Sequence, residues 1–302
     1  GEEVLEAEHS FRDQNVPLID ELSVEVPWHS LEAGSVRLTL QNRSETDYLL
    51  VGRVYLEESR RRALEIHSCP KWVQQGREFE VVLEPGMVVL DALHRIQAQD
   101  APDLAVRWNC KAGKCGSCSA EVNGQPKLTC MTRLSDYPAD EPLLVQPMKA
   151  FPLVRDLVCD VSWNYEVNKR IQPYQHPDID DPRMAQEDVD RVQEFRKCIE
   201  CFLCQDTCHV LREHELQPEF AGPRFLIRIA SLEMHPLDEG DRLAATRDDF
   251  AIGYCNITKC CTEVCPAGIN ITDNAIIPLK ERVVTEYYDP LAMITRKLGL
   301  RS

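Results

Sequence analysis

The sequence lacks a run of 18 or more consecutive apolar residues, so we expect no helix that spans a membrane. Positive charge is also scarce, because 34 Lys and Arg stand against 50 Asp and Glu and give a formal net charge of −16. A nucleic-acid partner requires a basic surface, so this balance argues against one. No secretory signal is visible at the N-terminus, and the first residue is Gly1 rather than Met.

Several common catalytic and nucleotide-binding motifs are missing as well. The chain has no Walker A loop, no His-Glu-x-x-His and no Gly-x-Gly-x-x-Gly after an expected strand. Isolated histidines such as His67 and His94 are more typical of solvated or packed side chains than of metal ligands. What the chain does have is 14 cysteines. Their spacings of two and four residues indicate metal binding in a reducing compartment rather than disulfides.

One cysteine-rich stretch, Cys198–Cys208, has the sequence CIECFLCQDTC. Its spacing, Cys-x2-Cys-x2-Cys-x3-Cys, is typical of two-cluster ferredoxins, in which the fourth cysteine binds a different cluster from the first three. A second motif is therefore expected downstream. It is found at residues 255–266, where Thr258 occupies the position of the middle cysteine of the template.

The exchanged ligation of two-cluster ferredoxins divides these cysteines into two predicted ligand sets. The first set would hold a [4Fe-4S] cluster with four thiolates: Cys198, Cys201, Cys204 and Cys265. The second set has only three: Cys208, Cys255 and Cys261. A cube with one corner lacking a ligand tends to lose that iron, so we predict a [3Fe-4S] cluster there. Cys260 could replace Cys261, but we interpret it as a free buried thiol, and structural zinc fits this spacing poorly.

A third cysteine group begins at Asn109–Cys118, which reads NCKAGKCGSC. The complete spacing, Cys-x4-Cys-x2-Cys-x11-Cys, is that of plant-type [2Fe-2S] ferredoxins, and a zinc knuckle is the less favoured alternative. The predicted ligands are Cys110, Cys115, Cys118 and Cys130. Gly113 and Gly116 would permit the sharp turns by which backbone N–H groups approach the cluster sulfurs.

The residues around these motifs predict an α+β fold, with an N-terminal β-grasp [2Fe-2S] ferredoxin domain and a C-terminal all-α two-cluster ferredoxin-like domain. Apolar periodicity predicts strands and one helix in the first domain: Ala63–Ser68, Glu78–Leu83, a hairpin at 119–129, Leu143–Pro147 and the helix Val89–Gln99. Further helices are expected at six places: from Phe151 with Pro152 in the first turn, Val189–Lys197, Pro223–His235, Asp241–Phe250, after a cap at Thr272 and Asp273, and Tyr287–Ser302.

The chain is predicted to divide into four segments. Residues 1–60 form an N-terminal extension of unknown role, in which 35–40 and 48–56 have the pattern of a β-hairpin. Residues 61–150 form the β-grasp domain, 151–185 a connecting helix and linker, and 186–302 the α-helical domain.

The order of the three cysteine motifs resembles that of the iron–sulfur subunit of succinate dehydrogenase and fumarate reductase (complex II), over about residues 61–290. The matching motifs lie at 107–118, Cys130, 198–208 and 255–266. Three redox centres without substrate chemistry on this chain predict an electron carrier. The resemblance implies the rest of succinate dehydrogenase (quinone), EC 1.3.5.1. A flavoprotein subunit with covalently bound FAD would oxidise succinate, and a membrane-anchor subunit, whose haem b content stays open, would bind quinone beside the [3Fe-4S] cluster.

The same resemblance implies a peripheral position on the cytoplasmic face of a bacterial cell membrane, in the respiratory chain and the tricarboxylic acid cycle. The sequence departs from the family near the expected quinone site, because many members have Pro and then Trp after the cysteine, whereas residues 209–213 read HVLRE. The motif sequences are more similar to bacterial, often menaquinone-linked, members. We interpret four residues as candidates near the quinone, with an anchor-docking or surface role as the alternative: His209, Arg212, Asn256 and Lys280.

Three other functions stay open. A quinol:fumarate reductase would use the same ligands, because reduction potentials set the direction of electron flow. A ferredoxin-like electron carrier of a soluble oxidoreductase is a further alternative. It is less favoured, because some such proteins add a cysteine-rich C-terminal region, whereas this chain ends about 37 residues after Cys265. A zinc-stabilised scaffold is the last, and metal analysis would distinguish it.

Overall fold

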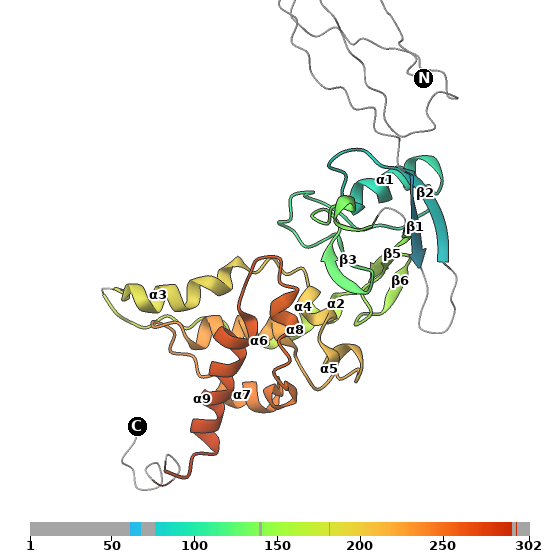
Figure 1. Cartoon of the computed structure of the whole chain (residues 1–302). Helices are drawn as coiled ribbons and strands as arrows, with labels where there is room; N and C mark the ends of the chain where they lie inside the picture. The colour runs from blue at the N-terminus through green and yellow to red at the C-terminus, as the bar shows by residue number, and fades with distance from the viewer. Residues whose placement is uncertain (1–60, 68–75, 139–140, 181, 292–293, 295–302) are drawn as a thin grey trace, which may run out of the picture. The chain divides into compact units, whose positions relative to one another are not determined.

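The computed structural model describes residues 61–67, 76–138, 141–180, 182–291 and 294 (Figure 1). The hairpin expected at 35–56 lies outside these residues, as does most of the helix expected at Tyr287–Ser302. In the part of the chain that is described, no helix combines the length and the apolar composition needed to cross a bilayer.

The first described region is built on a five-stranded mixed sheet with strand order β2-β1-β5-β3-β4. The strands are β1 (Arg61–His67), β2 (Gly76–Val82), β3 (Ser119–Val122), β4 (Gln125–Leu128) and β5 (Leu143–Gln146). β1 pairs parallel with β5 and antiparallel with β2, while β3 pairs antiparallel with β4 and β5. The strands expected from the sequence are confirmed, with their ends shifted by one or two residues.

One helix, α1 (Val89–Gln99), packs on this sheet and has the bounds that its apolar periodicity predicted. The Asp91 carboxylate accepts a hydrogen bond from the Val88 N–H at 3.1 Å and so caps the first turn. Leu93 and Ile96 are fully buried against Val122 and other sheet residues. The core of this region therefore lies between the helix and one face of the sheet.

The helix expected to begin at Phe151–Leu153 is wrong. Instead Leu153–Arg155 is strand β6, paired antiparallel with β7 (Val158–Cys159). Proline fits the first turn of a helix and the start of a short edge strand equally well, so Pro152 could not discriminate between them. A helix does follow, but as α2 (Ser162–Arg170).

The remaining described region is helical. Its elements are α3 (Gln186–Gln193), α4 (Leu203–Asp206), α5 (His209–Arg212), α6 (Pro223–Glu233), α7 (Leu243–Asp248), α8 (Cys260–Glu263), a π-helical segment Ile271–Ile276 and α9 (Ile277–Tyr287). The expected cap at Thr272 and Asp273 is wrong, because helical turns begin at Ile271 and these two residues lie inside them. The helices expected at Pro223–His235 and Asp241–Phe250 are present with shorter bounds, whereas α3 begins before the expected Val189 and ends before Lys197.

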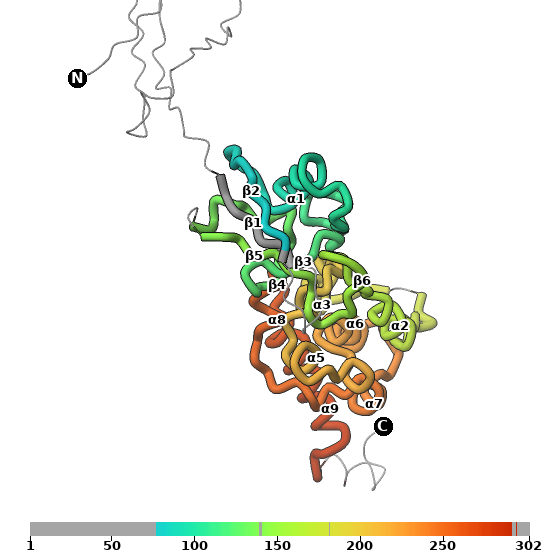
Figure 2. Tube along the Cα trace, turned by 90° about the vertical axis from the view of Figure 1, so that its right-hand side faces the viewer, coloured from blue at the N-terminus to red at the C-terminus, as the bar shows by residue number. Residues whose placement is uncertain are grey.

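Helix α6 is the centre of the helical core, and Figure 2 shows it among α2, α3, α5 and α7. Phe225, Leu226 and Ile229 are at most 1% exposed. The helix begins after Gly222, whose φ is +86° and whose added Cβ would lie 2.2 Å from the Gln205 side-chain oxygen. The turn into α6 therefore requires glycine for both its conformation and its packing.

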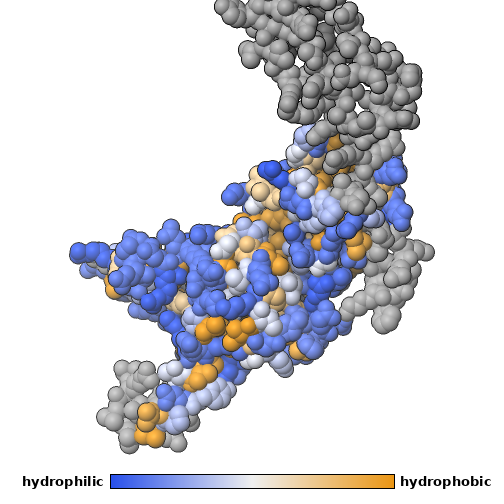
Figure 3. All heavy atoms as spheres, in the orientation of Figure 1, coloured by the Kyte–Doolittle hydropathy of each residue, from blue (hydrophilic) through white to orange (hydrophobic). Residues whose placement is uncertain are grey.

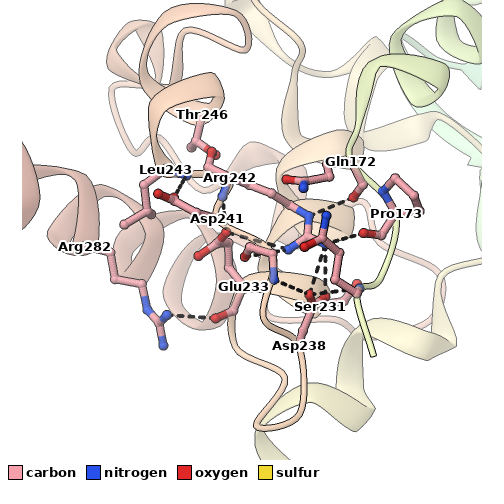
Figure 4. A network of polar contacts seen from close by, with 12 residues as sticks. Gln172, Pro173, Ser231, Glu233, Asp238, Asp241, Arg242, Leu243, Thr246 and Arg282 are labelled. Carbon is pink, nitrogen blue, oxygen red and sulfur yellow. Dashed lines mark hydrogen bonds and ion pairs between the residues drawn. The ribbon is translucent and has the colours of Figure 1, made fainter. Parts of the chain in front are cut away.

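The buried side chain of Arg242 links the connector after α2 to this helical region through hydrogen bonds (Figure 4). Arg242 is 2% exposed, and its guanidinium donates to the carbonyl oxygens of Gln172 and Pro173, both at 2.7 Å. It also pairs with Asp238 at 3.0 Å, while its backbone N–H donates to Glu233 at 2.6 Å. The network therefore holds the connector at residues 172–173 against the helical region.

The end of α9 presents apolar side chains to the solvent, and the apolar colour at the lower left of Figure 3 marks it. Four residues there are at least half exposed: Val284, Tyr288, Leu291 and Ile294.

Candidate iron–sulfur cluster sites

The cysteines of the predicted [2Fe-2S] group are held by a loop between α1 and β3 and by the turn after β4. Backbone N–H groups of Ala112 and Lys114 point at the Cys110 sulfur, at 3.4 and 3.3 Å. The Cys110 N–H points at the Cys115 sulfur at 3.5 Å. A loop that directs amide donors at its own sulfurs fits a site for an anionic iron–sulfur group.

The environments of the thiols differ within this group. Cys118 and Cys130 are buried, at 5% and 7% exposure, and burial raises the pKa of Cys130 to about 11. At Cys115 burial also acts to raise the pKa, but hydrogen bonds from Ser117 and Cys110 prevail and lower the pKa to about 7. Only thiolates bind iron, so metal binding must supply the free energy that ionises the buried thiols.

All four cysteines of the predicted [4Fe-4S] set line one cavity of about 330 Å³. Cys201 and Cys204 are 8% and 7% exposed, while Cys198 and Cys265 are half-buried. The wall is otherwise mostly apolar and includes Ile199, Phe202, Ile227 and Ile271. The donor set and the surrounding space therefore fit a cubane cluster. Among the described residues, no three Cys, His, Asp or Glu side chains are placed to hold a single metal ion.

Left-handed backbone turns make these motifs possible. Glu200 and Phe202 have φ values of +56° and +62°, and Ile257 and Lys259 in the second motif have +64° and +65°. Non-glycine residues adopt this region at a cost and cluster at functional sites. Here the turns bend the chain between successive cysteines. These turns could not be predicted from the sequence, because none of the four residues is glycine or asparagine.

Arg224 is a cation in the wall of the [4Fe-4S] cavity that sequence reasoning missed. It is buried and forms an ion pair with Glu200. Burial raises the pKa of the Cys198 thiol, and the charge of Arg224 opposes that rise. Arg224 therefore favours the thiolate form at this site. Its position in α6 did not indicate this role, because a surface arginine could occupy the same position.

The cysteines of the predicted [3Fe-4S] set lie within electrostatic reach of one another. Burial raises the pKa of Cys208 to about 12, with further contributions from Cys260 and Cys261. Burial likewise raises the pKa of Cys261 to about 11, with contributions from Cys260 and Cys255. Cys260 was expected to be a buried thiol, but it is only half-buried, and its sulfur lies 3.3 Å from the Thr258 hydroxyl.

The four quinone-site candidates differ in their contacts. His209 and Asn256 are in contact, with 2.8 Å between the histidine Nε2 and the amide nitrogen. Arg212 instead pairs with Glu121 of β3 at 2.8 Å. Lys280 lies half-buried on α9.

The [2Fe-2S] loop also lies directly against the [4Fe-4S] stretch. The Ser119 hydroxyl oxygen is 2.8 Å from the Cys201 carbonyl oxygen. A second cavity, of about 500 Å³, opens at this junction and is lined by Cys115, Cys159 and Cys201, among others. Two predicted cluster sites are therefore neighbours in space.

Comparison with known proteins gives concordant results. Residues 66–166 match a family described as a 2Fe-2S iron-sulfur cluster binding domain, and residues 194–269 one described as a 4Fe-4S dicluster domain. The chain is 34% identical over 232 residues to the fumarate reductase iron-sulfur subunit of Mycobacterium tuberculosis, covering 73% of this chain and 89% of that one. The chain belongs to the iron–sulfur subunits of succinate dehydrogenase and fumarate reductase.

Members named for both enzymes are among the relatives. The succinate dehydrogenase iron-sulfur subunit of Coxiella burnetii is 30% identical, covering 65% of this chain and 84% of that one. A chain of the Mycobacterium smegmatis Sdh1 complex in the apo form is 55% identical with a TM-score of 0.74, over 78% of this chain and 100% of that one. The predicted fold class, a [2Fe-2S] ferredoxin domain followed by a helical two-cluster domain, is thereby confirmed.

Proposed function

We propose that this chain is the electron-transfer subunit of a succinate:quinone oxidoreductase (EC 1.3.5.1) and holds one [2Fe-2S], one [4Fe-4S] and one [3Fe-4S] cluster. The observation that carries the proposal is the cavity shared by four thiols from two separate stretches of sequence. Cys265 reaches this cavity from the second motif, which supports the exchanged ligation of a two-cluster ferredoxin.

In this proposal the clusters, when bound, supply one-electron redox chemistry. The residues of the chain bind and bury them. The four cysteines of the first group hold [2Fe-2S], those around the 330 Å³ cavity hold [4Fe-4S], and Cys208, Cys255 and Cys261 hold [3Fe-4S]. Thr258 would leave the last set one ligand short, because a hydroxyl stands where the template has a thiol.

Electron paramagnetic resonance at low temperature, with iron and zinc quantified, tests this assignment. We expect a [3Fe-4S] signal in the oxidised protein and a [2Fe-2S] signal after reduction, with no stoichiometric zinc. Cys261→Ala should abolish the [3Fe-4S] signal, whereas the matched variant Cys260→Ala should retain it. The opposite result would assign Cys260 as the ligand, and two [4Fe-4S] signals would contradict the three-thiol site.

We further propose that a flavoprotein subunit with covalently bound FAD donates the electrons and that a quinone-binding membrane anchor accepts them at the cytoplasmic face of the membrane. The 55% identity to a chain of the Sdh1 complex supports a succinate-oxidising direction. The name of the M. tuberculosis relative favours a second candidate, quinol:fumarate reductase. Rates of succinate-dependent quinone reduction and quinol-dependent fumarate reduction, measured on the same purified complex, decide between them.

His209 and Asn256 are the proposed quinone-proximal pair, because they contact each other beside Cys208 and Cys255. A histidine there could donate a proton or a hydrogen bond to a reduced quinone. We expect His209→Ala to raise the KM for quinone while all cluster signals persist. His214, whose ring centroid lies 6.2 Å from that of His209, provides the matched control, and an unchanged KM in His209→Ala would exclude the role.

A further inference from the structure

Strand β3 is buried on both of its faces. Ala120 and Val122 belong to the hydrophobic core under α1. Side chains alternate along a strand, so Ser119 and Glu121 point to the opposite side. They are nonetheless only 7% and 0% exposed, and their partners include residues of the helical region. A short strand thus presents two polar side chains to a second domain.

The first of these side chains, Ser119, bridges the two cluster motifs. Its hydroxyl oxygen lies 2.8 Å from the carbonyl oxygens of both Gly116 and Cys201, so its single O–H can donate to either. Gly116 follows a proposed ligand of the [2Fe-2S] cluster, and Cys201 is a proposed ligand of the [4Fe-4S] cluster. The hydroxyl therefore holds together two backbone segments that each carry a cluster ligand.

The backbones meet at the same place. A Cβ added to Gly116 would lie 2.5 Å from the Cys201 Cα and 2.9 Å from its nitrogen, distances that real Cβ atoms do not reach. Glycine at this position therefore allows the backbones of the two motifs to approach each other closely. The contact explains a packing requirement at Gly116 in addition to its φ of +68°.

The second side chain, Glu121, fixes the orientation of the same junction. Its two carboxylate oxygens pair with Arg212 of α5 at 2.8 Å and with Lys149, after β5, at 3.0 Å. A buried carboxylate is costly unless cations and hydrogen bonds compensate it. The helical domain must therefore bring Arg212 to one position relative to β3. Arg212, which the sequence also made a quinone-site candidate, makes this contact.

We propose that Ser119 and Glu121 are positioning residues that fix the [2Fe-2S] site against the [4Fe-4S] site and thereby set the rate of electron transfer between them. The inference rests on the proposed function, because it assumes that both cysteine groups bind clusters. One electron leaves the reduced [2Fe-2S] cluster, which is oxidised, and enters the [4Fe-4S] cluster, which is reduced, without proton transfer or bond cleavage. Electron-transfer rates fall exponentially with separation, so a small displacement is measurable.

The test compares Ser119→Ala and Glu121→Gln with the unaltered protein in the complete complex. Iron content and the spectrum of each cluster are measured first. The spin–spin interaction between the two reduced clusters and the rate of electron transfer between them after flash reduction follow. We expect unchanged iron and individual spectra, a weaker spin–spin interaction, and a rate at least threefold lower in both variants. Ser119→Thr, which retains the hydroxyl, should restore both quantities.

Matched controls are available in the same chain. Ser231→Ala removes a hydroxyl that bonds to Arg228 within α6, and Glu166→Gln breaks an exposed pair with Lys169. Neither should alter the spin–spin interaction. If Ser119→Ala fails to assemble its [2Fe-2S] cluster, Glu121→Gln decides, since it lies farther from the ligands.

The outcomes separate the two proposals. Unchanged spin–spin interaction and transfer rate in the assembled variants would overturn the positioning role while leaving the cluster assignment intact. Missing cluster signals in the unaltered complex would instead contradict the proposed function.

Discussion

Arg242 and Arg212 each form an ion pair with a buried carboxylate, and they differ in what they join. Arg242 bonds to Asp238 of the helical region and to the carbonyl oxygens of Gln172 and Pro173 in the connector after α2 (Figure 4). Arg212, with a side chain 18% exposed, pairs with the fully buried Glu121 of the β-grasp sheet. The first network joins the helical region to the connector that precedes it, while the second joins the helical region to the β-grasp sheet.

The difference shows that the effect of a buried ion pair depends on which parts of the fold it joins. Arg242 donates hydrogen bonds to carbonyl oxygens of the connector and pairs with Asp238, so its loss should destabilise this part of the fold. Arg212 and Glu121 contribute fewer bonds, but these bonds lie beside the contact between Ser119 and Cys201. Loss of the Arg212–Glu121 pair should alter the geometry between the β-grasp sheet and the helical region more than it destabilises either of them.

The largest expected effect comes from Arg242→Met. The variant leaves Asp238 and Glu233 buried without their cation, which typically costs about 3–5 kcal/mol. Denaturant unfolding of the purified complex, followed by far-ultraviolet circular dichroism, measures the loss. Lys169→Met, which removes one partner of the exposed pair with Glu166, is the control and should change little. Similar stabilities for the two variants would contradict the structural role of Arg242.

Gly116→Ala should follow in size. It combines a positive φ with a steric clash against the Cys201 backbone, whereas Gly124→Ala has a comparable φ of +74° and open space. The control should lose roughly 1–2 kcal/mol for the left-handed conformation alone. Gly116→Ala should lose more and should also weaken the spin–spin interaction between the clusters. Equal effects of the two substitutions would show that the contact with Cys201 is unimportant.

A double-mutant cycle on Glu121→Gln and Arg212→Gln measures the pair between the domains directly. We expect a coupling free energy of about 0.5–3 kcal/mol, because the two side chains are in contact and largely buried. The exposed pair of Arg77 and Asp103, 3.2 Å apart, gives the reference cycle and should show weaker coupling. A coupling free energy no larger than that of the reference pair would contradict the proposal that the Glu121–Arg212 pair fixes the two domains relative to each other.

The smallest expected effect concerns the thiol of Cys159. Burial raises its pKa to about 11, and the negative charges of Asp206 and Glu121 add to the rise. At pH 8 the thiolate fraction is then on the order of one in a thousand, so alkylation by iodoacetamide should be slow and should accelerate as the pH rises.

Mutations in the Glu121 pair and in the Arg242 network should also have different effects on the reactivity of the Cys159 thiol. Glu121→Gln removes a negative charge, lowers the thiol pKa and should increase the alkylation rate slightly, as followed by mass spectrometry. Arg242→Met should leave the rate unchanged under native conditions. A faster reaction in both variants would point to general loosening of the fold instead of a local charge effect.

Much of the organisation could be predicted from spacing alone. The cysteine motifs predicted the domain order that the family matches confirm, and apolar periodicity predicted α1 to the residue. The ligand sets stay predictions, supported by the cavity around Cys198, Cys201, Cys204 and Cys265. These features are local, because spacing and periodicity are properties of short segments.

The errors share a cause. Pro152 fitted a helix and a strand equally, and only pairing with β7 decided for the strand. Arg212 stays a quinone-site prediction, but its partner Glu121, which lies 91 residues away, could not be predicted from its position after Cys208. Cys260 was expected to be buried, but it is only half-buried. Each outcome depends on contacts that short segments do not encode.

The sequence by itself determined the fold class and the order of the two iron–sulfur domains, and it predicted the kind of cluster at each site, because cluster ligation demands particular residue types at particular spacings. The tertiary structure decided which side chains face one another across the two domains. Ser119 and Glu121 are an unremarkable pair in a strand until the helical domain covers them. Only then do burial and the cost of an unpaired charge give these two residues their place between the cluster sites.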